Sequence, residues 1–360
     1  MTIPTTMNAM ILTGHGDLEM YEWRTDWPVP TPASDQVLVR VGACGLNNTD
    51  VNTRVGWYSK AISGATDAAT DATPDEDDPT WGGAPITFPR IQGADVCGEI
   101  VAVGADISPD RIGERIITDN WLRDPDDLLN MNKTGYFGSE MDGGYAEYTV
   151  LPARNALSVK SALSDAELAT FSCSYSTAEG MLERAKVTAA DTVLIPGASG
   201  GVGGALVQLA KRRGARVVAL ASEAKHGDVA ALGADIVLPR APDNIRKALG
   251  DEKITVLADV VGGPNWPTLV DVLERGGRLT TSGAIAGPMV DLDLRTLYLR
   301  DLTFTGSTII DLEVTPNLIR YIEAGDIKPA LAATYPLEEL RDAQAAFIEK
   351  KHTGNIVVVP

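Results

Sequence analysis

The residues that most clearly indicate a chemical role, by their kind and their separation along the chain, form a glycine-rich turn, Ala198-x-Gly200-x-x-Gly203. An apolar run at 193–195 precedes the turn, and a helical apolar pattern follows it. In such a unit, Gly200 lets the backbone approach a pyrophosphate, Gly203 lets the helix pack on the strand, and the unpaired amides of the helix N-terminus meet the phosphate charge. The turn therefore predicts a dinucleotide cofactor, with a tight turn that binds nothing as the alternative. The expected contacts are Ala198, Ser199, Gly200, Gly201, Val202 and Gly203.

The end of the following strand bears on which dinucleotide is bound. A site for NAD usually places an acidic residue there, against the ribose hydroxyl. This chain has Ala221 and then Ser222, although Glu223 comes next. Lys225 and Arg240 follow and could pair with a 2′-phosphate. We therefore expect NADPH rather than NADH, while solvated surface charge is the plainer reading of the two basic residues.

The composition bounds the class of protein. At 360 residues, two domains are expected, and 44% hydrophobic with 22% charged residues is ordinary for a globular protein. The net charge of -18 argues against nucleic acid and anionic membranes as partners. Three cysteines without a CxxC pair exclude a disulfide framework and a four-cysteine zinc lobe. The sequence shows neither a signal-peptide pattern nor an apolar run of membrane-spanning length, so we expect a cytoplasmic protein.

Two kinds of pattern divide the chain. The first part has short strand-like runs, which predict a compact β domain: 8–12, 36–41, 96–103, 115–118 and 146–151. A capping box, Ser164-x-x-Glu167, then begins a helix. From 191 to 308 six apolar runs alternate with helical patterns and predict a doubly wound parallel sheet: 193–195, 216–220, 236–238, 256–261, 278–282 and 302–306. A helix at 340–350 and a final strand at 355–359 follow, and we expect that strand to return to the first domain.

The segment 59–83 interrupts the β pattern. It is rich in Ala, Thr, Asp, Gly and Pro and carries an acidic run at 75–78, which predicts a mobile loop. Trp57, Tyr58 and Trp81 flank it. The loop is therefore either a lid over a substrate or a solvated insertion.

Eight landmarks together resemble the medium-chain dehydrogenase/reductase superfamily over nearly the whole chain, and most closely its quinone oxidoreductase and enoyl reductase branch. These landmarks are Gly45-Leu-Asn-Asn-Thr-Asp50, the motif at 93–104, Gly143-Gly-Tyr-Ala-Glu-Tyr148, the glycine turn, Gly233-Ala-Asp235, Asp259-Val-Val-Gly-Gly263, Gly306-Ser-Thr308 and His352-Thr-Gly-Asn-Ile-Val357. The resemblance implies an α/β fold with a GroES-like β-rich catalytic domain at 1–160, completed by 312–360, and a Rossmann domain at 161–311. It also implies a homodimer formed through the edge of the dinucleotide sheet.

The resemblance raises the question of zinc, because zinc alcohol dehydrogenases of this superfamily hold a catalytic metal with Cys, His and Cys. The matching positions here are Asn47, Ala94 and Cys173. Neutral Asn and Ala cannot supply the thiolate and imidazole of a tetrahedral site, so we expect no metal. A replacement site made by Cys173 with Cys44 and Cys97 is the alternative.

The expected chemistry follows from the missing zinc. Without a Lewis acid, an unactivated alcohol is hard to oxidise, whereas a quinone or an α,β-unsaturated carbonyl accepts hydride from NADPH more easily. Tyr58 matches the acid of related enoyl reductases, and Asn47 matches an Asn that can hydrogen-bond the carbonyl. Asp50 is the third catalytic candidate. A loop aromatic is the alternative for Tyr58, and turn formation is the alternative for Asn47 and Asp50.

Further cofactor contacts are expected from the family and from the strand ends of the dinucleotide sheet. They are Ser176, Thr177, Gly262, Gly283, Ser307 and Thr308. The alternatives to the reductase are an alcohol or aldehyde dehydrogenase of the same superfamily and a non-catalytic NADPH-binding protein.

Overall fold

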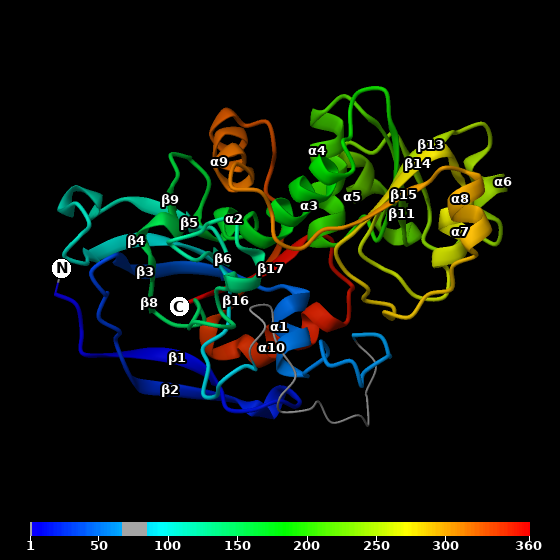
Figure 1. The fold of residues 1–360 in the computed structure, drawn as a ribbon. Helices are drawn as coiled ribbons and strands as arrows, with labels where there is room; N and C mark the ends of the chain where they lie inside the picture. The colour runs from blue at the N-terminus through cyan, green and yellow to red at the C-terminus, as the bar shows by residue number, and fades with distance from the viewer. Residues whose placement is uncertain (1, 67–84) are drawn as a thin grey trace.

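The computed structural model describes residues 2–66 and 85–360. Two large sheets make up two halves that meet along a seam, with a β-rich half and a half in which helices cover a parallel sheet (Figure 1). Most of the segment expected to be a mobile loop, including Trp81 and the acidic run at 75–78, lies outside the described residues.

The β-rich half is built on a seven-stranded sheet of order β16-β17-β3-β4-β5-β9, with β8 paired to β3. Its strands are β3 (Gln36–Gly45), β4 (Asp95–Val103), β5 (Arg115–Thr118), β8 (Tyr148–Pro152), β9 (Ala156–Ser158), β16 (Leu331–Pro336) and β17 (Asn355–Val359). The hairpin of β1 (Thr6–Leu12) and β2 (Tyr21–Pro28) and the short pair of β6 (Trp121–Leu122) and β7 (Gly135–Tyr136) lie beside it. The final strand joins this sheet as expected, because Val357 and Val358 of β17 pair with Gly45 and Cys44 of β3.

The second half is a six-stranded, all-parallel sheet of order β12-β11-β10-β13-β14-β15. Its strands are β10 (Thr192–Pro196), β11 (Arg216–Ala221), β12 (Ile236–Pro239), β13 (Ile254–Asp259), β14 (Leu273–Thr281) and β15 (Thr303–Gly306). In chain order this is the 3-2-1-4-5-6 arrangement of doubly wound dinucleotide-binding sheets. The predicted fold class is confirmed, while the exact domain boundaries stay a prediction.

Helices cover both faces of the parallel sheet because its strands alternate apolar side chains between two cores. Val193 and Ile195 of β10 face the core that holds α3 (Ser172–Arg184), α4 (Gly201–Arg212) and α9 (Val314–Ala324), whereas Leu194 faces the opposite core. The remaining helices are α1 (Asn48–Arg54), α2 (Asp165–Leu168), α5 (His226–Ala231), α6 (Ile245–Leu249), α7 (Trp266–Asp271), α8 (Leu294–Leu299) and α10 (Leu340–Ile348). None of the helices in the described part of the chain is long and apolar enough to cross a membrane.

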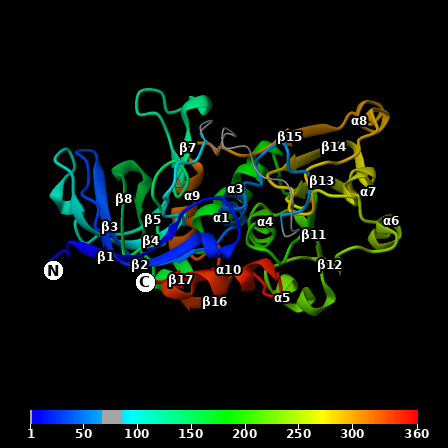
Figure 2. The same ribbon diagram turned by 90° about the horizontal axis from the view of Figure 1, so that it is seen from below.

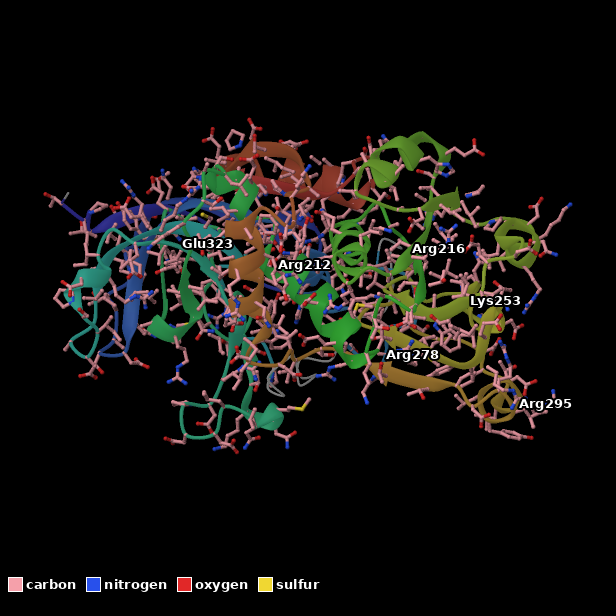
Figure 3. All side chains as sticks on the ribbon, turned by 90° about the horizontal axis from the view of Figure 1, so that it is seen from above. Arg212, Arg216, Lys253, Arg278, Arg295 and Glu323 are labelled. Atoms are coloured by element: carbon pink, nitrogen blue, oxygen red, sulfur yellow. The ribbon has the colours of Figure 1, made fainter. Side chains whose placement is uncertain are left out.

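Packing across the seam fixes the two halves against each other. The core around α3 also includes Ile117 and Trp121 from the β-rich half. On the upper side, α9 bridges the halves: the Glu323 carboxylate accepts a 2.8 Å hydrogen bond from the Lys160 amide, and Arg212 of α4 lies over the Tyr321 ring (Figure 3). On the lower side, α1 lies next to α10 within the β-rich half (Figures 1 and 2), and Lys225 of the other half donates a 2.6 Å hydrogen bond to the Lys350 carbonyl just after α10. The seam is therefore a defined place for a site.

Candidate functional site

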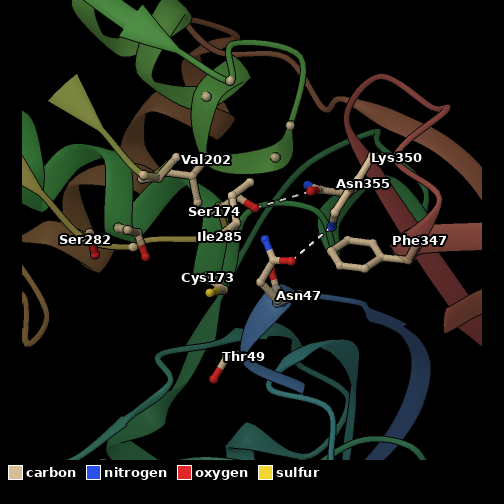
Figure 4. Close-up of a pocket in the computed structure, with 18 of the residues that line it drawn as sticks. Asn47, Thr49, Cys173, Ser174, Val202, Ser282, Ile285, Phe347, Lys350 and Asn355 are labelled. Carbon is tan, nitrogen blue, oxygen red and sulfur yellow. Dashed lines mark hydrogen bonds between the residues drawn. The ribbon is translucent and has the colours of Figure 1, made fainter. Parts of the chain in front are cut away.

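An open cleft lies at the seam between the two sheets and spans about 1530 Å³ when the open solvent at its mouth is included. Its walls come from α1, the start of α3, the glycine turn before α4, the carboxyl ends of β11, β13 and β14, and the C-terminal segment 347–355 (Figure 4). Ligands of doubly wound sheets bind at this edge, outside the carboxyl ends of the strands.

The glycine turn lines the cleft at residues 199–203, and Ala198 is buried just behind it. Gly200 is the N-cap of α4, so the first amides of that helix have no partner within the helix. A Cβ on Gly203 would lie 2.2 Å from the Gly197 carbonyl oxygen, and one on Gly201 would lie 2.1 Å from Asn355 Oδ1. Glycine at these two positions lets the turn pack closely on its own backbone and on Asn355, and the first amides of α4 suit a diphosphate.

Among the described residues that line the cleft, the charged ones are all basic. In a protein of net charge -18, the described part of the lining holds Lys225, Arg240 and Lys350 but neither aspartate nor glutamate. Pairing of Ala221 with Pro239 places Arg240 beside Ser222 at the carboxyl ends of β11 and β12. This end of the cleft therefore attracts a polyanion.

The structure gives Lys225 a partner that the sequence does not reveal. Its ammonium donates two 2.6 Å hydrogen bonds, to the carbonyl oxygens of Lys350 and His352. Burial lowers the pKa of Lys225, and the neighbouring Arg240 lowers it further. Burial also lowers the pKa of His352 to about 4, so this ring is neutral at physiological pH. Lys225 thus ties the C-terminal segment to the parallel sheet and places positive charge beside Arg240.

Two of the catalytic candidates, Asn47 and Asp50, lie at the start of α1 but in different positions relative to the cleft. Asn47 lines the cleft at 7% exposure, and its Nδ2 atom is buried, lies near Asp95 and makes no regular hydrogen bond within the described residues. Asp50 instead lies behind the wall, where its carboxylate accepts a 2.8 Å bond from the Asn47 amide and caps the helix. Burial raises the pKa of Asp50 to about 6. Asn47 can contact a ligand directly, whereas Asp50 positions it.

Tyr58 lies in the cleft beside α1. Its hydroxyl donates to Thr49 Oγ1 and accepts from Asn52 Nδ2, both at 3.4 Å, and its ring makes an edge contact with Trp57. Burial raises the pKa of Tyr58. The phenol therefore keeps its proton at neutral pH, and its long hydrogen bonds leave it able to turn toward a ligand.

A buried hydrogen-bonded group, made of Asp95, Asn120 and Tyr136, lies next to the cleft and was not predicted from the sequence. Asn120 Nδ2 donates to Asp95 Oδ1 at 2.9 Å and to the Tyr136 hydroxyl at 3.1 Å, and Asp95 Oδ1 also accepts from the Cys173 amide at 2.9 Å. Burial raises the pKa of Asp95 to about 7. The Tyr136 and Trp121 rings pack edge to face at 5.0 Å and line the cleft. Asp95 directly follows Ala94 in the sequence, but no local pattern indicates Tyr136.

The residues at the zinc positions do not fit a catalytic zinc. Ala94 is buried and offers no donor atom, and burial raises the pKa of the Cys173 thiol. Cys44 and Cys97 pack in different cores, so the alternative three-cysteine site is not assembled. Across residues 2–66 and 85–360, no three His, Cys, Asp or Glu side chains are grouped so as to hold a metal ion.

The other expected cofactor contacts are split between the wall and the layer behind it. Thr177, Gly283 and Thr308 line the cleft. Ser176 hydrogen-bonds within α3, Gly262 donates its amide to Asp259, and Ser307 is buried behind Thr308, so these three support the wall. Lining residues that the sequence did not indicate include Asn48, Thr49, Asn52, Ile285, Phe347, Lys350 and His352.

Comparison with known proteins agrees with this geometry. Residues 33–161 match the family model "Alcohol dehydrogenase GroES-like domain", and residues 201–324 match "Zinc-binding dehydrogenase". The chain is 26% identical to human quinone oxidoreductase over 366 residues, covering 98% of both chains, and 27% identical to an Arabidopsis thaliana NADPH-dependent alkenal/one oxidoreductase, covering 100% of this chain and 81% of that one. A crystal structure from Sinorhizobium meliloti 1021, described as a candidate alcohol dehydrogenase, has 46% identity, a TM-score of 0.90 and coverage of 99% and 98%. The chain therefore belongs to the medium-chain dehydrogenase/reductase superfamily of oxidoreductases, in its quinone oxidoreductase branch.

Proposed function

We propose that this protein is an NADPH-dependent, zinc-independent reductase of quinones or α,β-unsaturated carbonyl compounds. The observation that carries the proposal is the charge of the cleft. Lys225, Arg240 and Lys350 line it, and no carboxylate among the described lining residues stands where a site for NAD would place one.

The residues that line the cleft suit both the diphosphate and the 2′-phosphate of NADPH. The glycine turn at 199–203, which lines the cleft, and the N-terminus of α4 suit the diphosphate, while Ser222 and Arg240 suit the 2′-phosphate. When bound, the cofactor supplies a hydride.

The protein's own residues orient the acceptor and donate a proton. The Asn47 side chain, which lines the cleft, turns its buried amide nitrogen toward the acceptor and donates a hydrogen bond to the carbonyl oxygen, where negative charge develops. The Tyr58 phenol, protonated at neutral pH, supplies a proton to the product. The aromatic side chains of Trp57, Trp121 and Tyr136 form an apolar wall, which favours a neutral, planar acceptor.

The names of related proteins support the same chemistry. Besides quinone oxidoreductases, similar proteins include an acryloyl-coenzyme A reductase from Metallosphaera sedula and a 2-methylene-furan-3-one reductase from Solanum lycopersicum, each 26% identical. Alcohol dehydrogenase activity is the second candidate, since the Sinorhizobium relative is described in that way. The residues at the three zinc positions, Asn47, Ala94 and Cys173, argue against it because Ala94 has no donor atom and Asn47 is neutral.

We further propose a homodimer formed through the edge of the parallel sheet. β15 is the edge strand, and large apolar side chains are exposed next to it, on and before α8. They are Met289, Val290, Leu294, Tyr298 and Leu299. Such a patch is typical of a protein interface.

The proposal is tested by cofactor oxidation with purified protein whose metal content has been measured. NADPH and NADH are compared with 1,4-benzoquinone, 9,10-phenanthrenequinone and a 2-alkenal as acceptors, and NADP⁺ is paired with alcohols. We expect NADPH oxidation that survives chelator treatment. Bound zinc together with alcohol oxidation would establish the second candidate, and tight NADPH binding without turnover would indicate a non-catalytic protein.

A further inference from the structure

The C-terminal segment 347–355 forms one wall of the cleft and touches three separate parts of the protein. The Gly354 amide donates a 2.9 Å hydrogen bond to the Ser199 carbonyl of the glycine turn. Ser174 Oγ donates to Asn355 Oδ1 at 3.3 Å, as Figure 4 shows. Lys225 holds the carbonyls of the same segment from the other side. The segment is thus fixed against the place that suits a diphosphate.

Within this segment, Lys350 is the residue whose positively charged side chain lines the cleft (Figure 4). Its ammonium donates a 3.0 Å hydrogen bond to Asn48 Oδ1 and lies 3.5 Å from the centre of the Phe347 ring. The backbone at Lys350 has a φ of 52°, a conformation that non-glycine residues seldom adopt. Backbone of this kind persists where the surroundings hold it in place, often at a ligand site.

The place of Lys350 differs from that of the other two cations. Arg240 and Lys225 lie where β11 and β12 end, next to Ser222. Lys350 lies between the glycine turn and α1, because its segment bonds to Ser199 while its side chain reaches Asn48. Ser222, the glycine turn, Lys350 and Asn47 line the same cleft, so a dinucleotide that ran from Ser222 past the glycine turn toward Asn47 would bring its diphosphate toward this ammonium.

We propose that Lys350 is a cofactor-binding residue whose ammonium pairs with the diphosphate of the dinucleotide while it stays in contact with Asn48. Cofactor binding then anchors α1, the helix that carries the acceptor contacts. This inference rests on the proposed function only in requiring that the protein bind a nicotinamide dinucleotide.

The test is a set of dissociation constants for NADPH and NADH, measured by calorimetry on the whole protein. Lys350→Gln removes the charge but keeps an amide donor for Asn48, and Lys350→Arg keeps the charge. Lys351→Gln is the matched control, because its ammonium is exposed and pairs with Glu349. A charge-assisted contact predicts that K350Q weakens both dinucleotides by about tenfold or more and by the same factor. K350R should bind close to the wild type, and K351Q should equal it.

The outcomes separate the inference from the proposed function. Equal loss of NADPH and NADH affinity in K350Q, at an unchanged melting temperature, supports the diphosphate contact. Unchanged binding in K350Q overturns it, and so does a loss confined to NADPH, which would place the ammonium at the 2′-phosphate. A lowered melting temperature with the same loss in K350R would make Lys350 a purely structural residue. If the wild type binds neither dinucleotide, the proposed function itself fails.

Discussion

Replacing Arg240 with alanine is predicted to weaken NADPH binding and to leave NADH binding unchanged. Arg240 follows β12 and lies beside Ser222, where no carboxylate of the described lining would repel a phosphate. Only NADPH carries a phosphate on the adenosine ribose. The guanidinium therefore distinguishes the two cofactors if it pairs with that group.

The exposure of Arg240 sets the magnitude. A hydrogen bond to a charged group contributes about 1.5–3 kcal/mol. Because the Arg240 side chain is exposed, solvent screens the pair, and we expect the lower end of that range. A loss of about 1.4 kcal/mol corresponds to a tenfold rise in Kd. The difference between variant and wild type should shrink toward 1 M salt, where the Debye length is only about 3 Å.

The assay is a fluorescence titration of NADPH and of NADH at low and high salt. Lys247→Ala is the control, since this exposed lysine of α6 is not part of the cleft wall and its loss changes the net charge by the same amount. Equal weakening of both cofactors, or none, would refute the placement of the 2′-phosphate. Lys225→Ala is a poorer test, because Lys225 also holds the carbonyls of Lys350 and His352.

Three further predictions concern separate parts of the protein. Tyr58→Phe should lower turnover by about a hundredfold while NADPH affinity stays constant, and wild-type kinetics would make Tyr58 a wall residue only. Because burial raises the pKa of Asp95 to about 7, this carboxyl binds more protons in the native state than in the unfolded chain above about pH 4, so its contribution to the free energy of unfolding should decline as pH rises to about 7. Asp95→Asn should make that decline less steep in denaturant titrations, and an unchanged slope would contradict the assignment. Tyr298→Asp should shift the mass measured by light scattering toward the monomer, and an intact dimer would move the interface elsewhere.

Local patterns in the sequence predicted the parallel sheet well, but they did not predict every strand. The runs that became β10 to β15 are apolar and bounded by turns, so each could be recognised alone. β2 (Tyr21–Pro28) mixes charged and aromatic residues and is stabilised by pairing with β1, so its own sequence lacks a clean alternation. β16 (Leu331–Pro336) owes its place to parallel pairing with β17, which lies more than a helix away in the chain.

In the candidate site too, the sequence predicted residues that belong to local motifs but not those that the fold brings in from distant parts of the chain. Asn47, Tyr58 and Arg240 reach the cleft as expected, because each is fixed by a nearby motif or strand end. Lys350 and Tyr136 come from segments far from the glycine turn in the chain, and only the fold brings them to it. The helix-capping contact of Asp50 depends on burial, which a short turn sequence does not reveal.

The most direct test of the central claim follows a deuterium label with metal-free protein. NADPH deuterated at the transferable position is incubated with a 2-alkenal, and the product is analysed by NMR. We predict deuterium at the carbon β to the carbonyl and a solvent proton at the α carbon, at a rate unaffected by added zinc. Deuterium at the carbonyl carbon, with a rate that depends on zinc, would contradict the account and identify an alcohol dehydrogenase.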